Sequence, residues 1–501
     1  MPWLSTLMGV SVLGALGVTL VRNDKLAKQF TLVVSLIVLA LTVAMAVQFS
    51  PNGDKFQFAE TYDWIPAFGV HYGVAVDGIA LVLILLSVIL VPIVVLASWH
   101  DAEAGKRSVR TYFSLLLVLE AMMIGVFAAT DVFLFYVFFE AMLIPMYFMI
   151  GSYGGAQRSY AAVKFLLYSL FGGLLMLVAV IALYSIAGKG TFMFTDLVGT
   201  IQDVTTQKWL FLGFFIAFAI KAPLWPFHTW LPDAAAQAPA GAAVLLVGVL
   251  DKVGTYGMLR FCLELFPDAA KFFTPLVITL SVIGIVYGAI VAIGQTDMKR
   301  LIAYTSVSHF GFIAMGVFAM TTSAGAGATL YMVNHGFSTG ALFLIAGFLI
   351  YRRGSQYIAD YGGVQKVAPI LAGTFLVAGL SSLSLPGLST FVSEFMVLTG
   401  TFQRYVVPSV IATVGVILAA IYILWMYQRT MNGPTAESVK SLPDLNAREK
   451  WVVAPLVALL LVFGFYPKPL LDVIHPAVQD TLSSVSVTDP QPAVPVAQEG
   501  Q

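Results

Sequence analysis

Long apolar runs separated by short polar segments make up most of the sequence. Most runs reach the length of about 20 residues that an α-helix needs to cross the hydrocarbon core of a bilayer. They fall at about residues 2–21, 29–48, 77–98, 111–129, 132–150, 161–187, 209–230, 241–263, 274–294, 299–320, 326–350, 368–400, 406–427 and 451–466. The pattern predicts an all-α polytopic membrane protein with about fourteen transmembrane helices.

The composition excludes several other classes of protein. Of the 501 residues, 59% are hydrophobic and 10% are charged, whereas soluble domains have about 45–50% and 25%. Outer-membrane barrels are excluded because their strands alternate apolar and polar residues. The net charge of zero gives no basic surface for nucleic acid. The single cysteine, Cys262, excludes intramolecular disulfides and cysteine-ligated clusters, and we predict no metal site.

The distribution of basic residues predicts the orientation in the membrane. With the N-terminus outside, the cytoplasmic loops carry sixteen of the 26 Lys and Arg residues, the outside segments carry seven, including Arg260, and three lie inside helices. Basic residues concentrate on the cytoplasmic side of membrane proteins. We therefore expect both termini outside, with a disordered tail at residues 476–501, which are rich in Val, Pro, Gln and Ser.

Ionisable residues inside the predicted helices are the main functional signal. Each costs at least about 2.5–3.5 kcal/mol at the bilayer centre. Any one of them can be part of a structural ion pair that fixes helix packing. As a set, several have similar predicted depths near the membrane midplane, at 1.5 Å of rise per residue, which indicates a row that runs sideways within the membrane. The residues are Glu120, Glu140, Lys164, Lys221, Asp251, Lys252, His309, His335 and Glu394.

Two of the predicted helices contain breaks. Pro223 and Pro226 interrupt the seventh helix just after Lys221, and Pro386 with Gly387 interrupt the twelfth just before Glu394. Proline removes a helical hydrogen bond, and freed backbone in a membrane is tolerated only where it faces protein or water. The breaks therefore mark candidate sites beside the two charges, although each alone could be an ordinary kink.

The positions of the breaks predict an internal repeat. The broken helix is the fourth of five in both helices four to eight and helices nine to thirteen, and an odd number of helices inverts the second copy. We predict three N-terminal helices at 1–110, a first five-helix repeat at 111–265, an inverted second repeat at 266–430, and an inside loop with the last helix at 431–475.

The residue types in the row suit proton transfer. Burial favours the neutral form of a lysine, a neighbouring carboxylate favours its charged form, and histidine titrates near neutrality. We expect Glu140 and Lys221 to form an ion pair within the membrane, and Lys252 to carry an exchangeable proton.

Three sequence motifs resemble the antiporter-like membrane subunits of respiratory complex I, over about residues 1–475. They are 135–146 (FYVFFEAMLIPM), 221–234 (KAPLWPFHTWLPDA) and 297–309 (DMKRLIAYTSVSH). The resemblance implies a non-redox subunit of a translocase, the proton-translocating NADH:quinone oxidoreductase. The Ala- and Val-rich composition indicates a bacterial chain, so we expect a bacterial plasma membrane. It implies that this chain binds no cofactor, and that NADH, FMN, iron–sulfur clusters and quinone belong to partner subunits, which include the sister antiporter-like subunits L and N.

The resemblance also implies roles for individual residues. Glu140 with Lys221 is similar to the family's input-side pair, Lys252 to its central lysine, His309 and His335 to its central relay, and Glu394 to its output-side residue. Glu120 resembles a secondary glutamate. Subunits L and N usually carry lysine where this chain has Glu394. Asp251 departs from the family pattern and leaves the protonation state of Lys252 open.

Two other functions fit parts of the pattern. A subunit of a multisubunit cation/proton antiporter or membrane-bound hydrogenase would share the motifs. A membrane haem protein could use His309 and His335, which lie 26 residues apart on successive predicted helices, as axial ligands.

Overall fold

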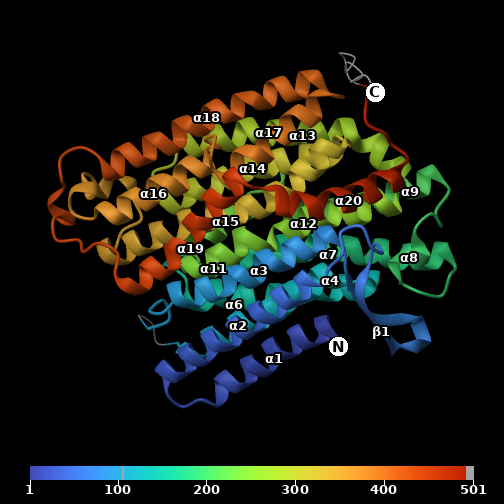
Figure 1. The fold of residues 1–501 in the computed structure, drawn as a ribbon, viewed down its shortest axis with the longest axis horizontal. Helices are drawn as coiled ribbons and strands as arrows, with labels where there is room; N and C mark the ends of the chain where they lie inside the picture. Colours follow the sequence, from blue (N-terminus) through green and yellow to red (C-terminus); the bar gives the residue numbers. More distant parts are fainter. Residues whose placement is uncertain (104–106, 492–501) are drawn as a thin grey trace, which may run out of the picture.

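Membrane-length helices form most of this computed structural model, which describes residues 1–103 and 107–491. Within those residues, twelve helical segments are long and apolar enough to span a bilayer, and they lie side by side in one bundle (Figure 1). They are α1 (Trp3–Leu20), α2 (Asp24–Val47), α3 (Gly78–Ala97), α4 (Val109–Ala128), α5 and α6 (Val132–Ala141 and Leu143–Tyr153), α7 (Arg158–Ala187), α9 (Val204–Lys221), the segment Ala240–Leu263, α13 (Pro267–Ile293), α14 (Met298–Phe318), α15 (Thr322–Arg353) and α18 (Val406–Met431).

Shorter helices complete the bundle. The helices α19 (Ala447–Phe465) and α20 (Lys468–Val485) would count as a thirteenth span with a bend of 67°. The pair α16 (Pro369–Ser382) and α17 (Ser389–Phe402) occupies the region predicted as the twelfth helix. The all-α membrane class is confirmed, while the count of fourteen and the two inverted repeats stay predictions. The remaining short helices are η1 (Pro66–Phe68), α8 (Phe194–Leu197), α10 (Trp230–Gln237), η4 (Ile358–Asp360), η5 (Val364–Lys366) and η6 (Glu437–Val439).

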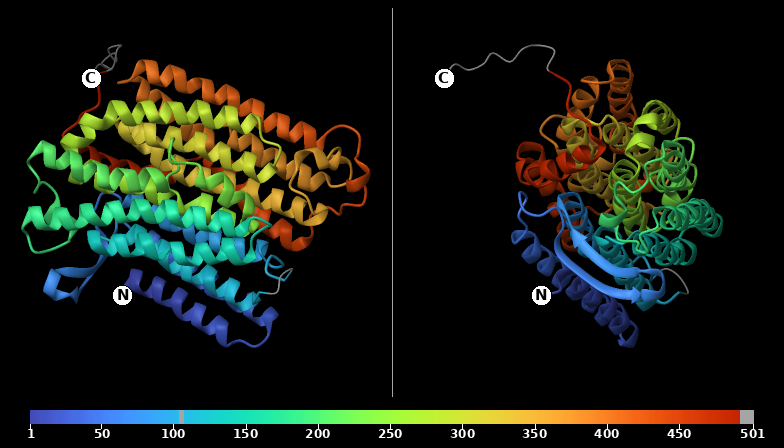
Figure 2. Two further views of the ribbon diagram at one scale, coloured as in Figure 1. Left: turned by 180° about the vertical axis from the view of Figure 1, so that it is seen from behind. Right: turned by 90° about the vertical axis from the view of Figure 1, so that its right-hand side faces the viewer.

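A β-hairpin that the apolar pattern does not predict lies across one end of the bundle, near the N-terminus (Figure 2). Strands β1 (Gln57–Ile65) and β2 (Val70–Val76) are antiparallel, with Tyr62 opposite Tyr72. The turn between α4 and α5 anchors the hairpin, because the Asp131 carboxylate accepts a 2.9 Å bond from the His71 N–H. The same carboxylate caps α5.

The C-terminal segment corrects the expectation of a disordered tail from residue 476. Helix α20 continues through Pro476 to Val485. Its buried residues recur at helical spacing, so one apolar stripe packs against the bundle despite the proline: Ile474, Ala477, Val478, Thr481, Leu482 and Val485. Residues 492–501 of the predicted tail lie outside the described residues.

A buried ion network joins the hairpin region to α20. Arg260 was expected in an outside segment, but it lies within the span Ala240–Leu263 and is 3% exposed. Its guanidinium binds Asp77 and, at 3.0 Å, Glu264. Glu264 also accepts bonds from Lys55 at 2.5 Å and Thr481 at 2.9 Å. The network therefore connects segments more than 400 residues apart in sequence.

We predict that Arg260→Met lowers the thermal stability of the assembled complex. The substitution leaves Asp77 buried without its cation, and breaking a buried pair costs about 3–5 kcal/mol. The melting temperature of the purified complex measures the effect. Lys440→Met is the matched control, because Lys440 pairs with Glu437 on the exposed surface and such pairs contribute little. Equal melting temperatures for the two variants would contradict the structural role of Arg260.

Candidate functional site

The centre of the bundle holds a fully buried lysine with three hydrogen-bond acceptors. Lys252 Nζ lies 2.7 Å from His335 Nδ1 and 3.2 Å from Asp251 Oδ1, and it also donates to the Val247 carbonyl. An ammonium has three N–H donors, so this environment matches the charged form of Lys252. His335 then accepts at Nδ1 and donates from Nε2 to Ser306 Oγ at 3.2 Å.

The backbone around Lys252 is not a regular α-helix. Between α11 (Ala240–Leu245) and α12 (Lys252–Gly257) lies a π-helical stretch, η2 (Leu246–Leu250), and η3 (Met258–Leu263) is a second one. The Asp251 N–H bonds to Leu246 instead of to Val247 four residues before it. Such π-bulges occur frequently at functional sites. Neither was predicted, because the segment has no proline.

Two histidines on neighbouring helices extend the site from Lys252. The rings of His335 on α15 and His309 on α14 are 5.2 Å apart between centroids and nearly perpendicular. His309 Nε2 lies 3.4 Å from the Tyr422 hydroxyl of α18, and its ring is 5.8 Å from that of Tyr331. The structure therefore brings Lys252, His335 and His309 together, as the sequence analysis expected.

Glu394 ends this chain of contacts. The Tyr331 hydroxyl donates to Glu394 Oε2 at 2.6 Å, and the Ser384 hydroxyl donates to the same oxygen at 2.9 Å. Two hydroxyl donors on one oxygen suit a carboxylate, which only accepts. Tyr331, Tyr422 and Ser384 were not among the predicted site residues. In the sequence, a tyrosine within an apolar helix looks like an ordinary packing residue. The only signal that could have indicated its role is a hydroxyl placed at helical spacing from an ionisable residue of the row.

The break between α16 and α17 positions the Ser384 donor. Ser384 and Gly387 have φ angles of +63° and +92°, in the left-handed region that favours glycine. The chain also needs a glycine at the facing position, because a Cβ on Gly464 would lie 2.3 Å from the Gly387 carbonyl oxygen. Because Ser384 donates to Glu394, the predicted interruption at Pro386 and Gly387 lies beside Glu394.

Glu140 and Lys221 lie at the other side of the site and make no direct salt bridge, so their expected ion pair stays a prediction. Between these described residues no charged N···O distance is within 4.0 Å, and Glu140 Oε1 and Lys221 Nζ have no hydrogen-bond partner. Lys221 Nζ instead lies 4.4 Å from the centre of the Phe139 ring. Glu140 reaches a groove on α7, where a Cβ on Gly173 would be 1.7 Å from Oε1.

The break after α9 lies beside the central helix. The Leu224 N–H bonds to the Ala219 carbonyl, and the Trp230 indole donates to Ile220 at 2.8 Å. The Ala219 carbonyl, four residues before Pro223 and therefore without its helical N–H donor, is thus satisfied by Leu224. A Cβ on Gly254 would lie 2.6 Å from the Ala222 nitrogen, so the break packs directly against the helix of Lys252.

The secondary residues lie away from this chain of contacts. Glu120 on α4 is fully buried and accepts a 3.2 Å bond from Ser11 of α1. Lys164 pairs with Asp233 at 2.7 Å, and Asp233 also binds Arg300 at 2.5 Å. Lys164 therefore takes part in a structural ion pair, the alternative that the sequence analysis gave for each of these residues.

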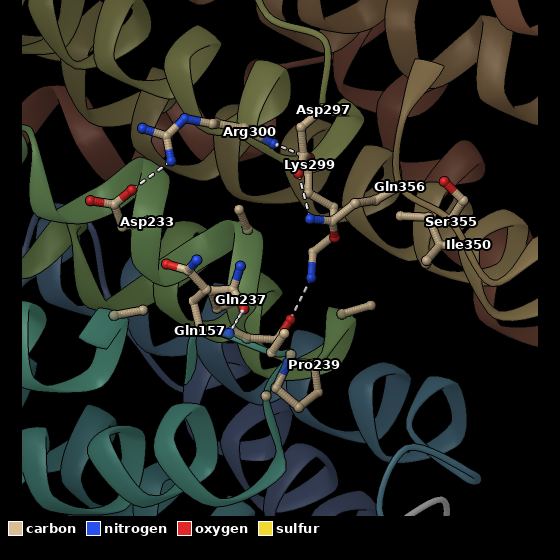
Figure 3. Close-up of a pocket in the computed structure, with 18 of the residues that line it drawn as sticks. Gln157, Asp233, Gln237, Pro239, Asp297, Lys299, Arg300, Ile350, Ser355 and Gln356 are labelled. Carbon is tan, nitrogen blue, oxygen red and sulfur yellow. Dashed lines mark hydrogen bonds and ion pairs between the residues drawn. The ribbon is translucent and has the colours of Figure 1, made fainter. Parts of the chain in front are cut away.

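A polar cavity of about 740 Å³ opens at the end of the bundle where Lys299 and Arg300 lie (Figure 3). Lys299 points across it to the Ala238 carbonyl. Burial raises the pKa of the Asp101 and Asp297 carboxyls, which lie in connecting segments that line this cavity. The cavity also reaches Ala240, where the helical segment that carries Lys252 begins. It therefore gives water a route to the start of that segment.

The geometry of the histidines suits proton transfer better than haem ligation. Both ring nitrogens of His335 are engaged by hydrogen bonds to Lys252 and Ser306, which leaves neither for iron. Within the described residues no group of three or more His, Cys, Asp or Glu side chains could hold a metal ion. Adjacent groups that both donate and accept protons can pass a proton along the row.

Comparisons with known proteins give consistent results. Residues 129–421 match the family model described as NADH:quinone oxidoreductase/Mrp antiporter, TM, and residues 4–126 match the amino-terminal model of NADH-ubiquinone oxidoreductase chain 4. The chain is 54% identical to NADH-quinone oxidoreductase subunit M of Mycobacterium tuberculosis, covering 98% of this chain and 96% of that protein. It is 43% identical to subunit M of Rhodobacter capsulatus, covering 91% and 90%.

Solved structures share the fold over nearly the whole chain. A chain of respiratory complex I from Thermus thermophilus with bound NADH superposes with a TM-score of 0.88 and 31% identity, covering 97% of this chain and 100% of that one. A chain of the Mrp complex from Dietzia sp. gives 0.86 at 19% identity, covering 97% and 99%, and shares the fold alone. The chain belongs to the family of antiporter-like membrane subunits of complex I, and within it to the NADH-quinone oxidoreductase subunit M proteins.

Proposed function

We propose that this chain moves protons through the membrane arm of NADH:quinone oxidoreductase by means of its buried row of Lys, His, Tyr and Glu. The observation that carries the proposal is the succession of neighbouring side chains from Lys252 through His335, His309 and Tyr331 to Glu394. Charged groups inside a membrane are costly and mark proton relays.

Each contact in the row supports one part of the transfer. Lys252 can give a proton to His335 Nδ1, since that nitrogen accepts its hydrogen bond. His309 lies next to His335 and faces the hydroxyls of Tyr331 and Tyr422. Tyr331 donates to Glu394, which we infer to be the output-side group. No electron carrier is needed within this chain.

The input side uses Glu140 and Lys221. Their separation in this structure supports a role in which the pair opens and closes, because a lysine without its carboxylate partner releases a proton more readily. The break at Ala222 packs on Gly254. A movement of Lys221 would therefore displace the helix that carries Lys252. Glu120 is assigned a secondary role beside this pair.

The wider setting follows from the family. We infer that NADH oxidation and quinone reduction occur in partner subunits, that sister subunits L and N are among the neighbours, and that the chain lies in a bacterial plasma membrane. The excess of basic residues in alternate loops supports a location of both termini outside. The high identity to subunit M proteins over nearly the whole chain favours complex I over a cation/proton antiporter. Co-purification in mild detergent identifies the partners.

We predict that Lys252→Ala and Lys252→Arg both impair proton pumping. Removal of a positioned acid–base group slows proton transfer by about 10²-fold or more, and arginine cannot deprotonate in a protein. The proton-to-electron ratio in reconstituted vesicles measures the effect, with NADH oxidation by an artificial acceptor as the control for assembly. Full pumping by Lys252→Arg would make Lys252 a fixed charge.

We predict that Glu394→Gln keeps the assembly intact but lowers proton transfer through this subunit. Glutamine preserves the shape and can accept from Tyr331 and Ser384, but it cannot ionise. Glu394→Lys is expected to retain part of the activity, because lysine also releases a proton. Vesicle pumping is compared with Glu437→Gln, an exposed control. A wild-type rate for Glu394→Gln would reduce this residue to a packing role.

We predict that Gly173→Ala lowers pumping. The new methyl group would lie 1.7 Å from Glu140 Oε1, so the carboxylate must leave its position. Gly373→Ala on α16 is the matched control, since its Cβ would meet no atom within 4 Å. Alanine favours helix over glycine by about 0.5–1 kcal/mol at both sites, so helix stability does not explain a loss. Normal pumping by Gly173→Ala would show that the position of Glu140 is unimportant.

A further inference from the structure

Asp251 is a buried carboxylate that the proposed relay does not use. Both Asp251 and Lys252 are fully buried. Oδ1 lies 3.2 Å from Lys252 Nζ, whereas Oδ2 has no hydrogen-bond partner among the described residues. Successive residues of an α-helix do not face each other. These two side chains meet where the π-helical stretch η2 ends.

The pair can hold one more proton than a lone lysine. The three acceptors around Nζ match an ammonium, so in the observed arrangement Lys252 is charged, Asp251 is ionised, and the pair is neutral. A proton on Asp251 would give the pair a single positive charge while Lys252 keeps all three of its bonds. A lone lysine could take up a proton only after it had lost one.

The free oxygen is the place where an extra proton can bind. Within the described chain, Lys252 Nζ is the only cationic atom within 4.0 Å of the Asp251 carboxylate. An ionised carboxylate oxygen that is buried without a donor is unfavourable, and protonation relieves that cost. Oδ2 is therefore available to take up a proton while Oδ1 keeps its contact with Lys252.

We propose that Asp251 is a second proton-carrying residue at the centre of the row. The proposal rests on the proposed function and names where the transferred proton resides before it reaches His335. A proton that arrives from the Lys221 side binds Asp251 Oδ2. Lys252 then gives one N–H proton to His335 Nδ1, the carboxyl group of Asp251 rotates so that the protonated Oδ2 faces Nζ, and the Asp251 proton moves to Nζ. One proton has moved from Asp251 to His335, and the ammonium and carboxylate are restored.

Infrared difference spectroscopy of the complex during turnover tests this assignment. The C=O stretch of a protonated carboxyl group is expected in the wild type, sensitive to ¹³C-carboxyl labelling of aspartate and to D₂O. Asp251→Asn is expected to abolish this band and to lower the proton-to-electron ratio several-fold. Glu120→Gln, which removes another buried carboxyl, is expected to keep it.

If Asp251→Asn lowers pumping but removes no aspartate band, Asp251 is a counter-ion only and the proposal is overturned. If Asp251→Asn does not assemble, Asp251→Glu is used, and the band must become sensitive to labelled glutamate; a band that still follows labelled aspartate overturns the proposal. Wild-type pumping by Lys252→Arg and Glu394→Gln would contradict the proposed function itself. Loss in those variants, together with normal pumping by Asp251→Asn, would contradict only the role of Asp251.

Discussion

Inside a bilayer every charge needs a protein environment, and this requirement organises the molecule. The segment that carries Lys252 and the helices α14 and α15 are almost entirely covered by other helices, whereas the outward faces of α2, α13 and α18 are apolar and exposed. The polar row is therefore enclosed by the helices with the most buried surface. Charged groups at this depth are tolerated because side chains, hydroxyls and a backbone carbonyl replace water around them.

Irregular backbone supplies those partners. The left-handed Ser384 directs a hydroxyl toward Glu394, and the π-helical stretch before Asp251 brings two adjacent side chains together. On the other side, the absence of a Cβ at Gly173 makes room for Glu140. Each irregularity lies next to a charge of the row, which agrees with the general observation that broken helices in membrane proteins mark functional sites.

Much of this could be predicted from the sequence because the bilayer imposes a strong rule. Helices must be apolar and about 20 residues long, so apolar runs locate them within a few residues. Charges inside such runs stand out, and Lys252, His335, His309 and Glu394 do lie together. The sequence pattern could not reveal partners that look ordinary in their local context, such as Tyr331 and Tyr422.

Other features escaped prediction for different physical reasons. The hairpin at 57–76 lies between apolar runs, where hydropathy carries no signal. The network of Arg260 joins residues that are distant in sequence. The C-terminal composition suggested disorder. However, Ile474, Val478 and Val485 recur at helical spacing, and their burial against the bundle stabilises a helix there. The sequence also could not show that Lys221 lies over the Phe139 ring and that Glu140 lies against Gly173.

The acceptor at Val247 has a consequence for genetic analysis of the site. Lys252 donates to a main-chain carbonyl, which every amino acid provides. A scan of single substitutions replaces side chains and therefore cannot delete this contact. Because the Val247 side chain is fully buried, a loss at position 247 in such a scan would report the packing of that side chain and not the contact of its oxygen with the central ammonium. Only a change in the backbone, such as an ester in place of the amide or a residue deleted from the π-helical stretch, would expose its contribution.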